Sequence, residues 1–199
     1  MSMKKKMLIL FISSTILLSG CQKDPLSEQV SQEISQLENV TLDDEDTVTE
    51  LENTYENMTD KQKNQVKNYT DLREARKKIE ELKKIQNMAE EAYDDPEYSI
   101  AVDACHAIEY AVGADDVYVD SAQIYDDGYM TYFKIGFTCN ADTGLMIKSM
   151  IFTYEGYKFS NFYEEGDSLY NVLNDHFTLP GEKEKAKELN TDVIMCLLE

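Results

Sequence analysis

The chain has 199 residues and a formal net charge of −20, with 19 basic side chains against 39 acidic ones. Nucleic acids and anionic lipid surfaces are bound through clusters of lysine and arginine, so a chain this acidic is repelled by both. The composition therefore excludes nucleic-acid binding, and the length allows one or two small domains.

Residues 1–20 predict a secretory signal peptide. Residues 4–6 are lysines, residues 7–18 are mainly apolar, and the small residues Ser19 and Gly20 stand just before Cys21. The apolar stretch is too short for a bilayer core, which needs about 20 such residues. We therefore expect a cleaved signal rather than a membrane span.

The end of this segment, Leu18-Ser-Gly-Cys21, resembles the lipobox of bacterial lipoproteins. In that family a diacylglyceryl group is attached to the cysteine thiol and the preceding peptide is removed. The resemblance implies a mature protein that begins at a lipidated Cys21 and is anchored to the extracytoplasmic face of the cell membrane. Residues 21–27 would then be the lipidated cysteine and a short spacer. An ordinary secretory signal with an unmodified Cys21 is the alternative.

Residues 28–94 predict a helical bundle or spacer. Up to residue 93 the segment contains neither glycine nor proline, and its apolar side chains repeat with helical spacing, as at Val30, Ile34 and Leu37. Capping-box patterns start new helices at Thr41 and Thr59. A long final helix is expected to follow from about residue 70.

Several short segments of this region occur together with regular spacing: Val40-Thr-Leu-Asp-Asp44, Tyr55-Glu-Asn-Met-Thr-Asp-Lys-Gln-Lys63, Val66 and Asn68-Tyr-Thr-Asp-Leu72. The pattern, over about residues 30–85, resembles a helical module of surface and secreted proteins of Gram-positive bacteria. In that family the module is a small antiparallel helix bundle with no known chemistry of its own. The resemblance implies a spacer or interaction arm that lifts the next domain off the membrane.

Residues 95–199 predict a small α+β domain. Pro96 disfavours helical backbone at Asp95, which places the domain boundary there. An amphipathic helix is expected over residues 98–112, and the apolar period then changes from 3.6 to 2. The predicted strands cover residues 117–125, 129–138 and 145–154, and the predicted helices cover 167–177, 182–189 and 191–198. The expected fold is a three-stranded antiparallel meander packed on helices.

The cysteines and histidines predict no metal site, cofactor or catalytic group. Cys105 and His106 are adjacent on a helix, so their side chains diverge by about 100°, and no Cys-x-x-Cys or His-x-x-x-His spacing occurs. Cys105 and Cys139 both lie on faces that should meet between helix and sheet. Core packing is the favoured interpretation, and a disulfide between them is the alternative. No spacing singles out a pair of carboxylates for hydrolysis.

Aromatic residues crowd the segment from residue 154 to 170, beside acidic side chains: Tyr154, Tyr157, Phe159, Phe162, Tyr163 and Tyr170. Aromatic rings with an acidic rim suit the binding of a peptide, a sugar or a cationic group. Packing between the third strand and the next helix is the favoured interpretation. If the segment binds a ligand, we expect the contacts at Tyr157, Phe159, Phe162 and Tyr163.

The sequence favours a non-catalytic binding or adaptor protein at the cell surface. We expect it to be held in the membrane through Cys21, with an unidentified protein or cell-wall partner. A small cell-envelope hydrolase is the first alternative. A solute-binding lipoprotein of a transporter is the second, for which the length is short if a two-lobed clamp is required.

Overall fold

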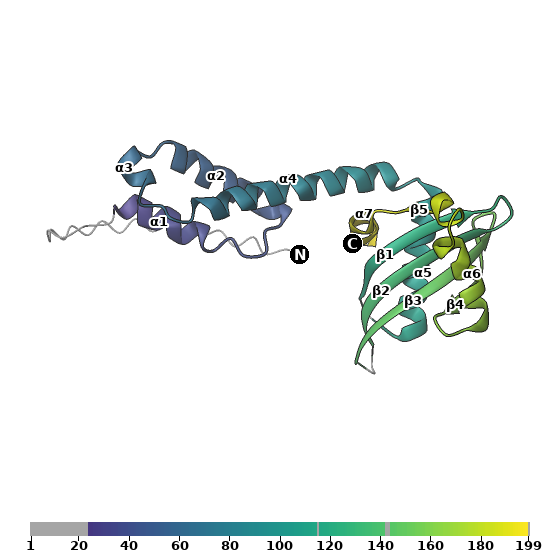
Figure 1. Ribbon diagram of the computed structural model, residues 1–199. Helices are drawn as coiled ribbons and strands as arrows, with labels where there is room; N and C mark the ends of the chain where they lie inside the picture. Colours follow the sequence, from purple (N-terminus) through teal and green to yellow (C-terminus); the bar gives the residue numbers. More distant parts are fainter. Residues whose placement is uncertain (1–23, 115, 142–143, 199) are drawn as a thin grey trace, which may run out of the picture. The chain divides into compact units, whose positions relative to one another are not determined.

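The computed structural model describes residues 24–114, 116–141 and 144–198, so Cys21 and the expected signal peptide lie outside the described residues. Helices and an antiparallel sheet together confirm the α+β class. The chain divides into two compact units between Ile79 and Glu80 (Figure 1). The division falls inside helix α4 (Tyr69–Ala92).

Unit 1 is helical. Before α4 it contains α1 (Pro25–Ile34), the 3₁₀ turn η1 (Leu42–Asp44), α2 (Glu45–Glu56) and α3 (Asp60–Lys63). The capping box expected at Thr59 forms, because the Thr59 amide donates to Gln62 Oε1 at 2.9 Å and the Gln62 amide donates to Thr59 Oγ1 at 3.4 Å. The buried core of the unit consists of Val30, Ile34, Val48, Leu51, Met58, Val66, Leu72, Ala75 and Ile79.

An ion pair joins α2 to α4 within this unit. Arg76 donates from Nε to Glu52 Oε2 at 3.0 Å and from Nη2 to the same oxygen at 2.6 Å. The same guanidinium group donates to Thr49 Oγ1 at 2.7 Å. Because arginine presents several donors in a fixed plane, this contact sets the rotation of α4 against α2.

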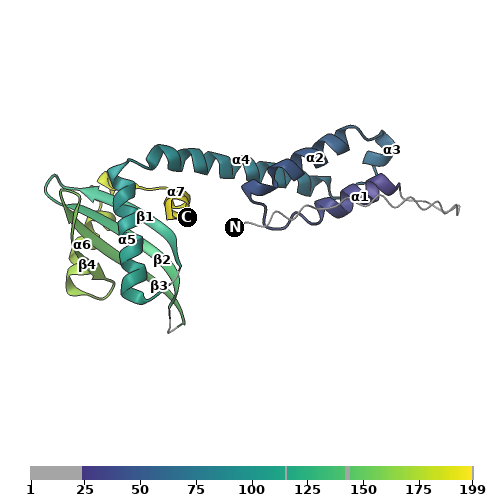
Figure 2. The ribbon, with the colours of Figure 1, turned by 180° about the vertical axis from the view of Figure 1, so that it is seen from behind.

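Unit 2 carries the sheet. It contains α5 (Pro96–Val112), β1 (Val117–Asp126), β2 (Thr131–Ala141), β3 (Gly144–Glu155), β4 (Lys158–Glu164), α6 (Ser168–Thr178), the 3₁₀ turn η2 (Lys183–Lys185), β5 (Lys187–Glu188) and α7 (Thr191–Leu198). The strands are antiparallel neighbours in the order β4-β3-β2-β1-β5. Helix α5 crosses one face of this sheet (Figure 2), and α6 packs on the opposite face.

The expected meander of three strands is wrong in number, because the described residues form five. Strand β4 has no regular pattern in the sequence, because a register shift near Ser160 interrupts its two-residue alternation. Strand β5 lies inside residues 182–189, which were expected to be helical. It is only two residues long and is fixed by pairing with β1, including a bond from the Leu189 amide to the Ala122 carbonyl at 3.0 Å.

The main core of unit 2 lies between α5 and the sheet. Phe133, Phe137, Phe152 and Tyr154 are its largest buried side chains, and Ile194 of α7 belongs to the same cluster. A second cluster, between the sheet and α6, contains Tyr125, Ile151, Tyr170 and Phe177. The sheet is therefore covered on both faces, and its order leaves β4 as an edge strand.

The last turns of α4 pack within unit 2. Ala89 and Ala92 form a buried cluster with Val193 of α7. The domain boundary predicted from the sequence lies instead between residues 94 and 95, just before Pro96. Helix α4 thus continues into the second unit and ends at Ala92, and Pro96 begins α5.

A fragment of residues 80–199 is therefore expected to be more stable than a fragment of residues 95–199. The shorter fragment lacks Ala89 and Ala92, so Val193 loses its cover, and burying a valine side chain contributes about 1.5–3 kcal/mol. Urea unfolding of both fragments measures the difference. As a control, Val193→Ala should destabilise the longer fragment more than the shorter one. Equal unfolding midpoints would show that the end of α4 contributes nothing.

Candidate binding surface

Two of the predicted contact residues, Phe159 and Phe162, lie together on the α5 side of β4. Their ring centroids are 6.3 and 6.0 Å from that of Phe152, which is buried in the main core. The two side chains are nevertheless 54% and 39% exposed. We call Phe159 and Phe162 the aromatic shelf, because they continue the apolar face of the core onto the open edge of the sheet.

A bulge in β4 places these two residues on one face. Residues three apart in a regular strand point to opposite faces. Here the register passes from Thr153 opposite Asn161 to Tyr154 opposite Phe159, so one extra residue lies between the two phenylalanines. The sequence predicted Phe159 and Phe162 as contact residues, but it carried no signal for this shift and so could not separate them from Tyr157 and Tyr163.

The other two predicted contact residues lie elsewhere. Tyr163 is half-buried on the opposite face, where it packs on the cluster of Ile151 and Tyr170. Tyr157 occupies the β3–β4 turn with a φ of 63° and lines a small cavity of about 140 Å³ together with Lys185 and Lys187. The structure therefore brings together two of the four residues and separates the rest.

Charged groups border the aromatic shelf. A shallow hollow of about 620 Å³ lies beside Phe159, and Glu155 and Lys158 contribute to its lining. At the other end of β4, Glu164 accepts a hydrogen bond from Lys148 Nζ at 2.8 Å. The shelf is therefore an apolar strip with a carboxylate and a lysine near each end.

Beneath the shelf, Tyr154 links the sheet to α5. Its hydroxyl donates to the Ile100 carbonyl at 3.3 Å, and its ring packs edge-on against Phe159 with centroids 6.0 Å apart. Burial raises the pKa of Tyr154, and the negative charge of Asp103 on α5 raises it further. Tyr154 is thus a structural residue that supports the shelf from below.

Two amide donors at the outer edge of β4 are occupied. Just after β4, the Glu165 amide donates to β3 at 3.2 Å, so the alternation of an antiparallel pair points the Phe162 and Glu164 amides away from β3. The Phe162 amide donates to Asn161 Oδ1, and the Glu164 amide donates to Asp167 Oδ2, both at 2.9 Å. Side chains of the same chain therefore satisfy these two edge donors.

A second exposed apolar group lies on the opposite face of the sheet. Tyr118 of β1 and Ile147 of β3 lie in register on either side of Thr138 of β2. Leu145 lies two residues before Ile147 on the same face of β3. All three apolar side chains are exposed. Within the described part of the chain, Tyr118 makes no ring contact of the kind that joins Phe152 to the shelf, so these three residues offer a comparison for it.

Cys105 and Cys139 are buried free thiols in the main core. Burial raises the pKa of Cys105 to about 12, with a further contribution from the charge of Glu109, and burial also raises the pKa of Cys139. The structure brings the two residues into one cluster, and their oxidation to a disulfide stays a prediction.

In the native protein, Cys105 and Cys139 are expected to resist alkylation at about pH 8, because only the thiolate reacts. Cys196, whose side chain is partly exposed, is the internal control and should be modified first. Unfolding should make all three reactive, as mass spectrometry of the modified peptides will show. Rapid native labelling of Cys105 would contradict this, and labelling that requires a reductant would establish the disulfide.

Histidine takes part in an aromatic stack on the α6 side of the sheet. His176 stacks against both Tyr125 and Tyr132, with centroid distances of 4.6 Å to each, and the two tyrosine rings are themselves 6.0 Å apart. The Tyr125 hydroxyl donates to Glu182 and the Tyr132 hydroxyl to Asp127. The stack holds α6 and η2 against the first hairpin.

Hydrogen bonds lower the pKa values of both carboxylates in this cluster. Asp127 accepts bonds from the amides of Met130 and Tyr129, and Glu182 accepts bonds from Lys185 and Tyr125.

Within residues 24–114, 116–141 and 144–198, no three His, Cys, Asp or Glu side chains lie where they could hold a metal ion. No helix in the same ranges combines the length and apolarity needed to cross a membrane.

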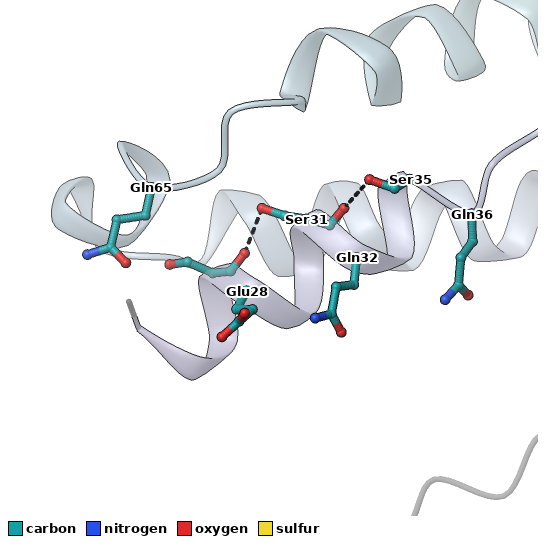
Figure 3. A pocket seen from close by; sticks show the side chains of 7 residues that line it. Glu28, Ser31, Gln32, Ser35, Gln36 and Gln65 are labelled. Carbon is teal, nitrogen blue, oxygen red and sulfur yellow. Dashed lines mark hydrogen bonds between the residues drawn. The ribbon is translucent and has the colours of Figure 1, made fainter. Parts of the chain in front are cut away.

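A polar groove of about 500 Å³ runs along α1 in unit 1 (Figure 3). Three of its serines use their hydroxyl groups as donors to backbone carbonyls: Ser27 to Gln62 at 3.0 Å, Ser31 to Ser27 at 2.8 Å and Ser35 to Ser31 at 2.9 Å. The Ser27 bond attaches α1 to the end of α3, whereas the other two bonds lie within α1 and its C-cap.

No protein-family model, no curated protein and no solved structure matches this chain. The resemblances of residues 18–21 to a lipobox and of residues 30–85 to a helical module stay predictions.

Proposed function

We propose that this protein is a lipid-anchored, extracytoplasmic and non-catalytic binding or adaptor protein. Unit 2 binds the partner, and the helical unit serves as its spacer. The aromatic shelf is the observation that carries this proposal. Two phenylalanines that continue a buried core but remain exposed favour association, because covering apolar surface contributes about 25 cal/mol per Å².

The anchor at Cys21 supplies the location. A diacylglyceryl group has two acyl chains, which is enough for stable attachment, whereas a single chain binds a membrane only marginally. A protein attached in this way meets partners in the envelope or on the cell surface. The acidic surface keeps the exposed part soluble.

The observations favour binding over the two alternatives. A glycan hydrolase needs a carboxylic acid whose pKa is raised so that it can donate a proton. Hydrogen bonds instead shift the pKa values of Asp127 and Glu182 downward. A solute receptor encloses most of its ligand, whereas the hollow beside Phe159 is lined by one hairpin.

Crosslinking in intact cells followed by mass spectrometry tests the proposal. The wild-type protein should capture a recurrent partner, and the double variant Phe159→Ser/Phe162→Ser should lose it. Leu145→Ser/Ile147→Ser is the control, because it removes a similar exposed apolar area from the opposite face. A partner retained by the shelf variant, or no partner above an unrelated lipoprotein, would overturn the proposal.

A further inference from the structure

We propose that the aromatic shelf binds a basic segment of a partner protein, with an apolar side chain over the two rings and lysine or arginine side chains at either end. The segment lies across the face of β4 and does not add a strand to its edge. This inference rests on the proposed binding function and specifies the partner and its mode of binding.

Charge complementarity identifies the partner as basic. The whole chain carries −20, so its field attracts cations and repels acidic segments. Close to the shelf, Glu155 shares the lining of the hollow with Lys158, and Glu164 is paired with Lys148, so the attraction for cations comes from the net charge of the whole chain. Asp103 adds a negative charge near Tyr154, on which Phe159 packs.

The shelf itself suits a segment with both cationic and apolar side chains. Faces of phenylalanine rings attract ammonium and guanidinium groups within about 6 Å. The long stems of lysine and arginine can lie on the rings while their charged ends stay in water, in the negative field of the chain. Two exposed rings on one supported face therefore match a basic segment with a central apolar residue.

The occupied edge donors determine the mode of binding. A peptide that joins a sheet must accept hydrogen bonds from the free amides of the edge strand. The Phe162 and Glu164 amides already donate to Asn161 and Asp167, so strand addition would have to break both bonds. Docking on the face leaves these bonds intact, and affinity then depends on side chains rather than on the partner's backbone.

A fluorescent lysine-rich peptide with one central leucine is the probe, and fluorescence anisotropy with the full protein in detergent micelles measures its binding. The shelf variant Phe159→Ser/Phe162→Ser should bind about tenfold or more weakly, as expected for the loss of a central aromatic contact. The control Leu145→Ser/Ile147→Ser has the same net charge and should change affinity by less than about twofold.

Two further measurements separate charge and backbone contributions. Raising the salt from about 0.05 to 0.3 M should weaken binding several-fold, because screening reduces the attraction between exposed charges. Methylating alternate backbone nitrogens of the peptide should leave affinity within about twofold, because a face-docked peptide does not depend on ladder hydrogen bonds. Glu155→Gln should weaken binding more than the control variant does.

These measurements distinguish face docking from strand addition, and a basic partner from an acidic or neutral one. Loss of binding to the methylated peptide would establish strand addition and overturn face docking. Equal binding of a peptide with glutamate in place of lysine, or tighter shelf-dependent binding of a neutral oligosaccharide, would overturn the basic partner. In those cases a shelf-dependent partner captured in cells would still uphold the proposed function. Absence of any such partner would instead overturn the function itself.

Discussion

Replacing Cys21 by serine is expected to move the protein from the membrane pellet to the soluble fraction. Serine offers a hydroxyl where the lipid-transfer reaction needs a thiol, so the variant receives no diacylglyceryl group. Each buried methylene of an acyl chain contributes about 0.8 kcal/mol to membrane attachment, so losing two chains removes almost all affinity. Fractionation followed by immunoblotting measures the change.

Cys196→Ser is the matched control for this experiment and should remain in the pellet. It changes the same residue type far from the expected anchor. Mass spectrometry of the first mature peptide should also show the added lipid in the wild-type protein and not in the variant. If the Cys21→Ser protein stays in the pellet after a high-salt wash, the anchor assignment is wrong.

Replacing Phe133 by alanine is expected to destabilise unit 2 by about 3–5 kcal/mol. Phe133 is fully buried in strand β2, with Ile124 of β1 and Phe152 of β3 as its neighbours in register. The substitution leaves a cavity that the surrounding strands cannot close. Because small domains are stable by only about 5–15 kcal/mol, this loss is a large part of the total.

Phe159→Ala provides the comparison for Phe133→Ala, because the same residue type is shortened in the same sheet. Phe159 is exposed, so its loss should cost less than about 1 kcal/mol. Urea unfolding of both variants, with hydrogen exchange at the β2 amides as a local measure, distinguishes the two. Similar losses would show that the exposed ring is part of the core and would weaken its assignment as a binding surface.

Local chemistry explains which elements the sequence could predict. Thr59 and Gln62 determine a helix start by bonds three residues apart, and Asp126-Asp-Gly128 determines a turn, so both are visible in the sequence. Strand β5 is different, because its two residues are extended only through pairing with β1. No local pattern can show a contact with residues more than sixty positions away.

The sequence predicts which segment contains the candidate binding surface. It does not predict which side chains of that segment lie on the same side of the sheet. Composition indicated aromatic crowding near residues 157–163. Which rings share a side of the sheet depends on the register, and the bulge near Ser160 changes it by one residue. That shift places Phe159 with Phe162 and leaves Tyr163 with Tyr170 on the other side.

The side-chain acceptors at the β4 edge have a further consequence for a protein held on a membrane. Copies confined to two dimensions meet far more often than copies in free solution, and bare strand edges at such density would join into ribbons. Asn161 and Asp167 occupy the amides that would begin this growth. If the proposed anchor at Cys21 is correct, copies of the molecule can therefore be crowded on a membrane and still remain separate.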